Sequence, residues 1–150
     1  MGGNNHSNYI KIEKVIIMAR AGDSYVVSLG RAHLGWGDYR HTDTRGRRQG
    51  EAYLPIPIRY AREYSVYNSN ATGGDVLGEN IFNCQSVDGF LDCRMKAQGC
   101  IDGGEPFAKQ FSAAGNLRTL GLWYEHVGAT VGDRVRVTWT SEYDMIIEKL

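Results

Sequence analysis

Short runs in which apolar and polar residues alternate recur along the chain, and they predict β-strands joined by turns. The clearest run lies at 135–140, where Val135, Val137 and Trp139 fall on one face of an extended chain. A polar turn follows this run and leads into a second apolar run at 145–150. The C-terminal region therefore predicts a β-hairpin.

An Asp88-Gly89 pair predicts a second hairpin in the middle of the chain. It separates two strand-like runs, 80–87 and 90–98, and Asp-Gly between such runs is a strong hairpin signal. Three further runs are short, rich in apolar and β-branched residues and bounded by turn residues: 25–29, 51–56 and 109–114. Seven strands are therefore expected.

Two segments carry helical signals. Apolar residues recur at helical spacing over 116–127, with Asn116 as an N-cap and Gly128 as a stop. A shorter helix is expected to open at Pro57 and to run through Tyr64, because proline suits the first helical position.

Seven short strands and two short helices in this order predict a mainly β fold, a seven-stranded open or nearly closed β-barrel, rather than a parallel sheet. The 150 residues suit a single domain, with residues 1–8 as a flexible tail. The run 9–22 fits a helix and a strand equally well. No apolar run reaches the ~18 residues that span a bilayer, and no secretory signal opens the chain, so a cytoplasmic protein is expected.

The cysteines point to packing rather than to chemistry. The chain has an odd number of cysteines, and their spacing is not that of a zinc site: Cys84, Cys93 and Cys100. Cys84 and Cys93 fall in strand-like runs, where a free cysteine packs as a small apolar residue. We therefore expect neither disulfides nor a bound metal.

The segment 30–50 has almost no apolar periodicity and contains five glycines, and a polar segment of this length in a compact domain is often functional. The whole chain has a net charge of zero. This segment, however, carries five arginines and two histidines against two aspartates: Arg31, Arg40, Arg45, Arg47, Arg48, His33, His41, Asp38 and Asp43. A local basic segment on a neutral protein favours attraction to phosphates at one face.

A second polar segment, 99–108, follows the central hairpin. Arginine reads guanine through a bidentate fork, glutamine reads adenine, and carboxylates accept from cytosine. Both polar segments and their flanks offer such mixed donors and acceptors, which suit base recognition better than phosphate neutralisation alone. Composition leaves open that both segments are merely solvated.

No catalytic motif stands out in the sequence. It contains no GxSxG, HExxH, P-loop or dinucleotide-binding glycine pattern. The residues that come closest to the metal site of a metal-dependent nuclease are Asp144, Glu148 and Lys149. We interpret them as the solvated ends of a surface strand. We therefore expect a non-catalytic chain without a cofactor.

Two stretches carry a resemblance to a known family. Residues 40–68 combine a polar loop rich in glycine and threonine with Tyr53-Leu54-Pro55, and residues 108–150 follow the order strand, helix, Val-Gly-Asp, hairpin. These features resemble the DNA-binding pseudobarrel of restriction endonucleases, found in EcoRII, BfiI and NgoAVII and related to the plant B-three transcription-factor domain. The likeness covers about residues 25–150.

The resemblance implies that two arms enter the major groove: a first arm at 31–50 and a second arm at about 96–110. Arg48 then falls where the family can carry a base-contacting histidine, which suggests a guanine in the target, and Tyr53 falls near the DNA. Arg118 would meet a phosphate or be solvated. The residues expected at DNA are Arg40, His41, Thr42, Asp43, Thr44, Arg45, Arg47, Arg48, Gln49, Tyr53, Lys96, Gln98, Asp102, Glu105, Lys109, Gln110 and Arg118.

The resulting hypothesis is a monomeric domain that recognises a short double-stranded DNA sequence. It would serve as the recognition or effector domain of a type II restriction endonuclease in a restriction-modification system, with a nuclease domain as a partner in the full-length protein. Two alternatives remain: a small nuclease with an unrecognised metal site, or a carbohydrate- or peptide-binding barrel. Trp36, Tyr39 and Trp123 would form the platform of such a barrel, although Trp36 and Tyr39 can also fold the first arm onto the domain.

Overall fold

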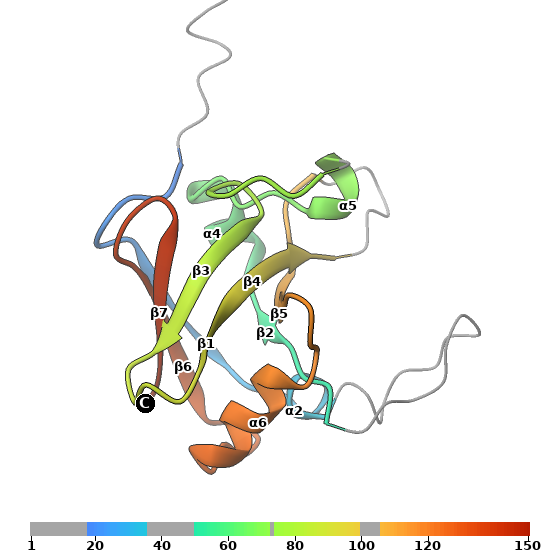
Figure 1. Ribbon diagram of the computed structural model, residues 1–150, viewed down its shortest axis with the longest axis vertical. Coiled ribbons are helices and arrows are strands. Elements are labelled where there is room, and N and C mark those ends of the chain that lie inside the picture. The colour runs from blue at the N-terminus through green and yellow to red at the C-terminus, as the bar shows by residue number, and fades with distance from the viewer. Residues whose placement is uncertain (1–17, 36–49, 73, 100–105) are drawn as a thin grey trace, which may run out of the picture.

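A single seven-stranded mixed sheet forms the body of the protein and curls into a nearly closed barrel (Figure 1). The computed structural model describes residues 18–35, 50–72, 74–99 and 106–150. The strand order is β1-β6-β7-β3-β4-β5-β2. The strands are β1 (Ser24–Ser28), β2 (Leu54–Pro55), β3 (Ile81–Ser86), β4 (Asp92–Gln98), β5 (Gln110–Ala113), β6 (Arg134–Trp139) and β7 (Asp144–Lys149). The seven-stranded open barrel predicted from the sequence is confirmed.

Both predicted hairpins, β3–β4 and β6–β7, are present and antiparallel. They are joined by a parallel pairing of β3 with β7, in which Asn83 lies opposite Asp144. The Asn83 side-chain amide donates a hydrogen bond of 2.9 Å to the Asp144 carboxylate across this pair. Local alternation could not predict the parallel contact, because it depends on which distant strands meet.

Strands β1 and β2 are the two ends of the sheet order, and tyrosines close the seam between them. The Tyr25 hydroxyl on β1 donates to the Pro55 carbonyl on β2 at 3.1 Å. The Tyr64 hydroxyl donates to the Ser24 carbonyl at 2.7 Å, and the ring of Tyr60 stacks on Tyr25 at 5.5 Å. Helix α4 (Ile58–Glu63), which carries Tyr60, therefore covers the seam.

Four helices lie in the described part of the chain, two at each end of the barrel (Figure 1). Helices α4 and α6 (Thr119–His126) correspond to the two predicted helices. Helix α6 begins later than expected, because the Asn116 side chain accepts from the N–H of Arg118 and forms a turn before the helix. Helices α2 (Arg31–Leu34) and α5 (Ser69–Thr72) lie in segments expected to be loops, since four residues are too few to show helical periodicity.

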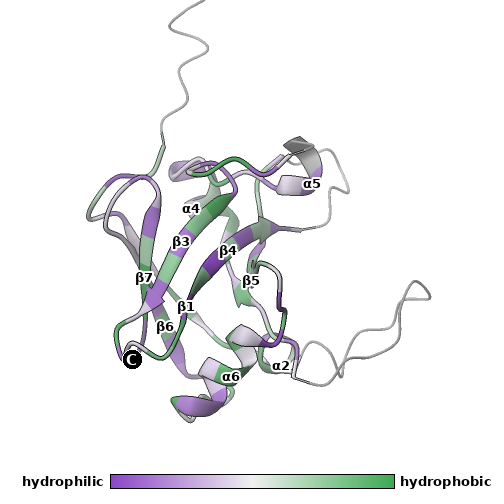
Figure 2. Cartoon of the chain, in the orientation of Figure 1, coloured by the Kyte–Doolittle hydropathy of each residue, from purple (hydrophilic) through white to green (hydrophobic). Residues whose placement is uncertain are grey.

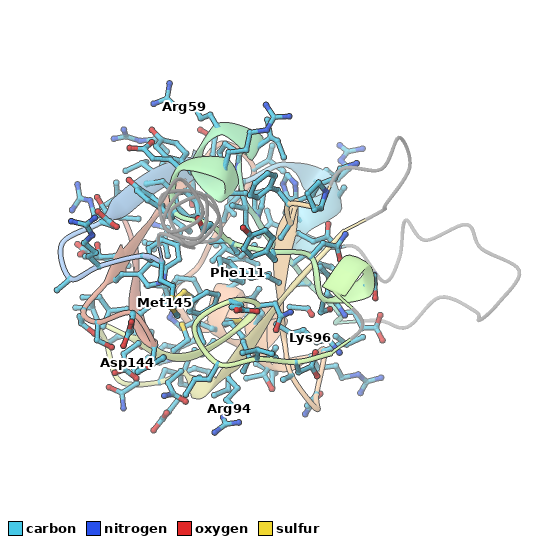
Figure 3. The ribbon with its side chains drawn as sticks, turned by 90° about the horizontal axis from the view of Figure 1, so that it is seen from above. Arg59, Arg94, Lys96, Phe111, Asp144 and Met145 are labelled. Atoms are coloured by element: carbon cyan, nitrogen blue, oxygen red, sulfur yellow. The ribbon has the colours of Figure 1, made fainter. Side chains whose placement is uncertain are left out.

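Aromatic and aliphatic side chains fill the barrel. Trp139 is fully buried, and Phe82 packs edge-to-face against it with ring centroids 5.8 Å apart. Phe111 and Met145 point into this interior in Figure 3, whereas Arg59 and Arg94 project from opposite sides of the barrel. Hydrophobic and hydrophilic residues alternate along β3 and β4 (Figure 2).

The cysteines of the described residues belong to this packing. Cys84 is buried and lies opposite the half-buried Cys93 on the neighbouring strand. Burial raises the pKa of the Cys93 thiol to about 11, which disfavours the reactive thiolate. Cys84 thus packs as a small apolar residue, as predicted. Among the described helices, none has the length and apolar character needed to cross a membrane.

Candidate nucleic-acid interface

The two arms are anchored at opposite ends of one short ladder. The described ends of the first arm are Gly35 and Gly50, and those of the second arm are Gly99 and Pro106. Strand β2 follows the first arm, β5 follows the second, and the two strands pair antiparallel. The ladder continues past β2, where the Ile56 N–H donates to the Lys109 carbonyl at 2.8 Å.

This arrangement separates the two arm bases along one side of the barrel. Gly50 and Ile56 are six residues apart, which in extended chain is up to roughly 20 Å. In Figure 1 the base of the first arm lies beside α2 and α6, and the base of the second arm lies beside α5 on the same side of the barrel.

Helices α2 and α6 hold the base of the first arm. The N–H of Tyr53 donates to the His33 carbonyl of α2 at 3.0 Å, and the Tyr124 hydroxyl of α6 donates to the Tyr53 carbonyl at 2.9 Å. Tyr53 itself is only 4% exposed. The resemblance puts this residue near DNA, but its side chain has little surface to offer a duplex.

His33 has a second role at the start of α2. Its Nδ1 atom accepts a hydrogen bond of 2.8 Å from the N–H of Gly30. Only an unprotonated nitrogen can accept in this way. Burial also lowers the pKa of His33, so the neutral form is favoured at the base of the first arm.

Arg118 lies beside the same base. Arg118 is exposed and immediately precedes α6. If Gly50 carried a Cβ atom, the nearest atoms to it would be the side-chain carbons of Arg118. Together with Gly35 and Gly50 it lines a cavity of about 520 Å³ between α2 and α6. A guanidinium there can reach an anion that approaches the first arm.

Three predicted residues lie at the base of the second arm. Gln98 on β4 lies directly opposite Gln110 on β5, and the N–H of the exposed Lys109 donates to the Gln98 carbonyl at 2.8 Å. The Gln98 side-chain oxygen accepts from the Ser112 hydroxyl at 2.9 Å, which orients its amide. The two amides thus lie side by side on one face of the sheet, whereas the Lys109 side chain starts from the other face, against Gly99.

Lys96, a fourth predicted residue, already has a partner. Its ammonium group lies 3.4 Å from the carboxylate of Asp75, and both side chains are partly exposed. The two residues line a polar hollow of about 380 Å³ with Ser69, Asn70 and Gly74. A phosphate that binds Lys96 must therefore compete with Asp75.

Eleven of the seventeen predicted residues lie outside the described residues. They are Arg40, His41, Thr42, Asp43, Thr44, Arg45, Arg47, Arg48, Gln49, Asp102 and Glu105. The sequence did not single out Asn68 or Asp75, which lie in a polar segment. Their importance becomes visible only once this segment is known to pack against β4 and the second arm.

Three residues named for the two alternative functions, Asp144, Lys149 and Trp123, have structural partners. The Asp144 carboxylate accepts hydrogen bonds from Asn83 and Ser141, which lower its pKa, and Lys149 lies 3.7 Å from Asp133. Trp123 is fully buried and donates from its indole nitrogen to Asp88 at 2.9 Å. The expectation that Trp123 forms an exposed binding platform is therefore wrong. Among the described residues, no group of three His, Cys, Asp or Glu side chains is arranged to hold a metal.

Comparisons with known proteins concern the fold. No protein-family model and no curated protein matches the sequence. A hypothetical protein of Arabidopsis thaliana is similar with a TM-score of 0.48 at 8% identity, over 89% of this chain and 95% of its own. The N-terminal domain of Helicobacter pylori LlaJI.R1 is similar with a TM-score of 0.48 at 8% identity, over 85% of this chain and 79% of its own. The protein in the Arabidopsis FUS3–DNA complex is similar with a TM-score of 0.46 at 13% identity, over 83% of this chain and 93% of its own.

Proposed function

We propose that this chain binds double-stranded DNA in a sequence-specific manner, with its two arms in the major groove. One observation carries the proposal: the two polar arms lead into opposite ends of the β2–β5 ladder, and their bases lie on the same side of the barrel. The six residues from Gly50 to Ile56 can span at most roughly 20 Å, a length of the same order as the major groove, which is about 12 Å wide.

The polar groups at the arm bases suit two kinds of contact. Lys96, Lys109 and Arg118 carry positive charge, and phosphate contacts from such groups fix the register of a protein on the duplex. Gln98 and Gln110 carry amides, which can pair with the edge of an adenine. The arginines of the first arm, Arg48 among them, are the groups that we expect to read guanine.

We further propose that the chain is a recognition domain without catalytic activity, associated with a type II restriction endonuclease in the cytoplasm. It would act as a monomer and direct a nuclease domain to its site, without needing a metal for binding. This proposal is supported by the resemblance of residues 40–68 and 108–150 to the restriction-endonuclease pseudobarrel. The structural partners of Asp144 and Lys149 also favour it over a nuclease site at β7.

Selection from a random duplex library, followed by sequencing of the bound fraction, tests the proposal. We expect enrichment of one short motif, and no cleavage when the same chain is incubated with plasmid and Mg²⁺. A bound fraction without an enriched motif would contradict sequence-specific recognition. Plasmid cleavage that is lost in Asp144→Ala would instead indicate a nuclease.

A further inference from the structure

One buried residue bonds both ends of the second arm. Asn68, which is fully buried, donates from its side-chain amide to the Gly99 carbonyl at 2.8 Å. Its backbone N–H donates to the Pro106 carbonyl, also at 2.8 Å. Gly99 and Pro106 are the described residues on either side of the second arm, so Asn68 ties the outgoing chain to the returning chain.

The residues just before Asn68 strengthen this connection. The Ala108 N–H donates to the Val66 carbonyl at 3.0 Å, and Tyr67 pairs with Phe107 with their rings stacked at 5.3 Å. Residues 66–68 thus run antiparallel to residues 106–108 and continue the sheet beyond β5. The returning end of the second arm is therefore fixed to a segment outside the barrel strands.

The Asn68 side chain has a defined orientation. Its Oδ1 atom accepts from the N–H of Asn70 at 3.0 Å, which directs the Nδ2 donor to Gly99. The Asn70 side chain adds a longer hydrogen bond of 3.3 Å to the same Gly99 carbonyl. Loss of the Asn68 amide would leave the Gly99 carbonyl with the longer bond from Asn70 and would therefore loosen the outgoing chain.

We propose that Asn68 is a positioning residue that sets binding specificity by fixing Gly99 and Pro106, and with them the neighbouring Gln98, at the base of the second arm. The inference rests on the proposed DNA-binding function, since it assumes that the amides at this base read bases. Base reading needs donors and acceptors at hydrogen-bond distance and angle, whereas attraction to phosphates depends on charge and tolerates displacement. Loosening the arm should therefore reduce discrimination between sequences more than it reduces binding to random duplex.

Asn68→Asp is the test variant, because it keeps the side-chain size and the acceptor for Asn70 but replaces the donor that faces Gly99. Asn80→Asp is the matched control. Asn80 is equally buried, its amide donates to the Gly74 carbonyl at 2.8 Å, and it accepts from the Val76 N–H at 2.7 Å. It thus fixes the loop before β3 instead of the second arm.

The dissociation constants of both variants and of the wild type are measured for a library-selected duplex and a random duplex, together with the thermal midpoints. The specificity ratio is the dissociation constant for the random duplex divided by that for the selected duplex. We expect this ratio to fall by about tenfold or more in Asn68→Asp, since one lost base contact is worth about that much. The ratio should stay within about twofold of the wild type in Asn80→Asp, although both variants lose stability.

An unchanged ratio in Asn68→Asp, or an equal fall in Asn80→Asp, would overturn the positioning role. A wild-type chain that does not discriminate between the duplexes would instead overturn the proposed function. If Asn68→Asp does not fold, Tyr67→Leu removes the ring stack on Phe107 from a partly exposed position and keeps Asn68. Its ratio should then fall by about threefold, and an unchanged ratio would contradict the role of this segment.

Discussion

Gly121, the third residue of α6, lies against the backbone carbonyl of Gly50 at the base of the first arm. A Cβ atom at position 121 would overlap the Gly50 oxygen. Glycine within a helix costs about 1 kcal/mol relative to alanine, so its presence here needs a reason. The close approach of the first arm to α6 supplies that reason.

Gly121→Ala should therefore destabilise the protein, although alanine favours the helix. Overpacking against a backbone atom costs about 1–3 kcal/mol, and we expect a net loss of about 1–2 kcal/mol in urea unfolding. Leu122→Ala changes the neighbouring residue of the same helix, which is half-exposed, and should alter stability by about 0.5 kcal/mol or less. A more stable Gly121→Ala variant would show that α6 and the first arm do not need this contact.

The stability of the fold should depend on pH through His33, which lies at the base of the first arm. Because burial lowers the pKa of His33, the unfolded state binds the proton more readily than the folded state. The stability that His33 contributes should be complete above its ordinary pKa of about 6.5 and should decrease as the pH falls below that value. Thermal midpoints at pH 7.5 and 5.5 measure the change.

His33→Gln provides the comparison for this prediction, since glutamine offers an acceptor that does not titrate. The variant should lose less stability between the two pH values than the wild type does. Equal losses in both proteins would mean that the hydrogen bond from Gly30 to His33 does not sense the proton.

Asp75 should weaken DNA binding, because it occupies the Lys96 ammonium group. An exposed ion pair of this kind is worth up to about 1 kcal/mol, so Asp75→Asn should bind duplex about twofold to fivefold more tightly at low salt. Asp92→Asn removes another exposed carboxylate from the same strand as Lys96, without touching the pair, and should have a smaller effect. Equal gains in affinity in both variants would mean that the change in net charge, and not release of Lys96, strengthens binding.

Lys109 should contribute one phosphate contact at the base of the second arm. Lys109→Ala should weaken binding to all duplexes to a similar degree and reduce the slope of log K against log salt by about 1. Arg94→Ala removes an exposed arginine four residues before Gln98 on β4, farther from the arm, and should leave the slope unchanged. A sequence-dependent loss in Lys109→Ala would assign this residue to base contact instead.

Local signals in the sequence predicted the barrel strands well. The alternation around Val137 and the Asp88-Gly89 turn depend only on neighbouring residues, and both hairpins are present as expected. Strand β2 is shorter than the run 51–56, because the preceding residues bond to α2 and α6 instead of to a strand.

The candidate site was less predictable, since its residues act through distant contacts. Lys109 and Gln98 stand out as polar residues beside a polar segment, but the burial of Tyr53 depends on how the first arm packs. Asn68 looks like any loop asparagine in the sequence. Its role follows from hydrogen bonds to residues 31 and 38 positions away, which no local pattern encodes.

The central claim is sequence-specific binding of duplex DNA, and a competition titration tests it most directly. The wild-type chain is titrated with a library-selected duplex and with a scrambled duplex of the same composition, at about 50 and 200 mM salt. We predict that the selected duplex binds at least about a thousandfold more tightly and that both affinities fall steeply as the salt increases. Equal affinity for the two duplexes, or affinity that does not respond to salt, would contradict the claim.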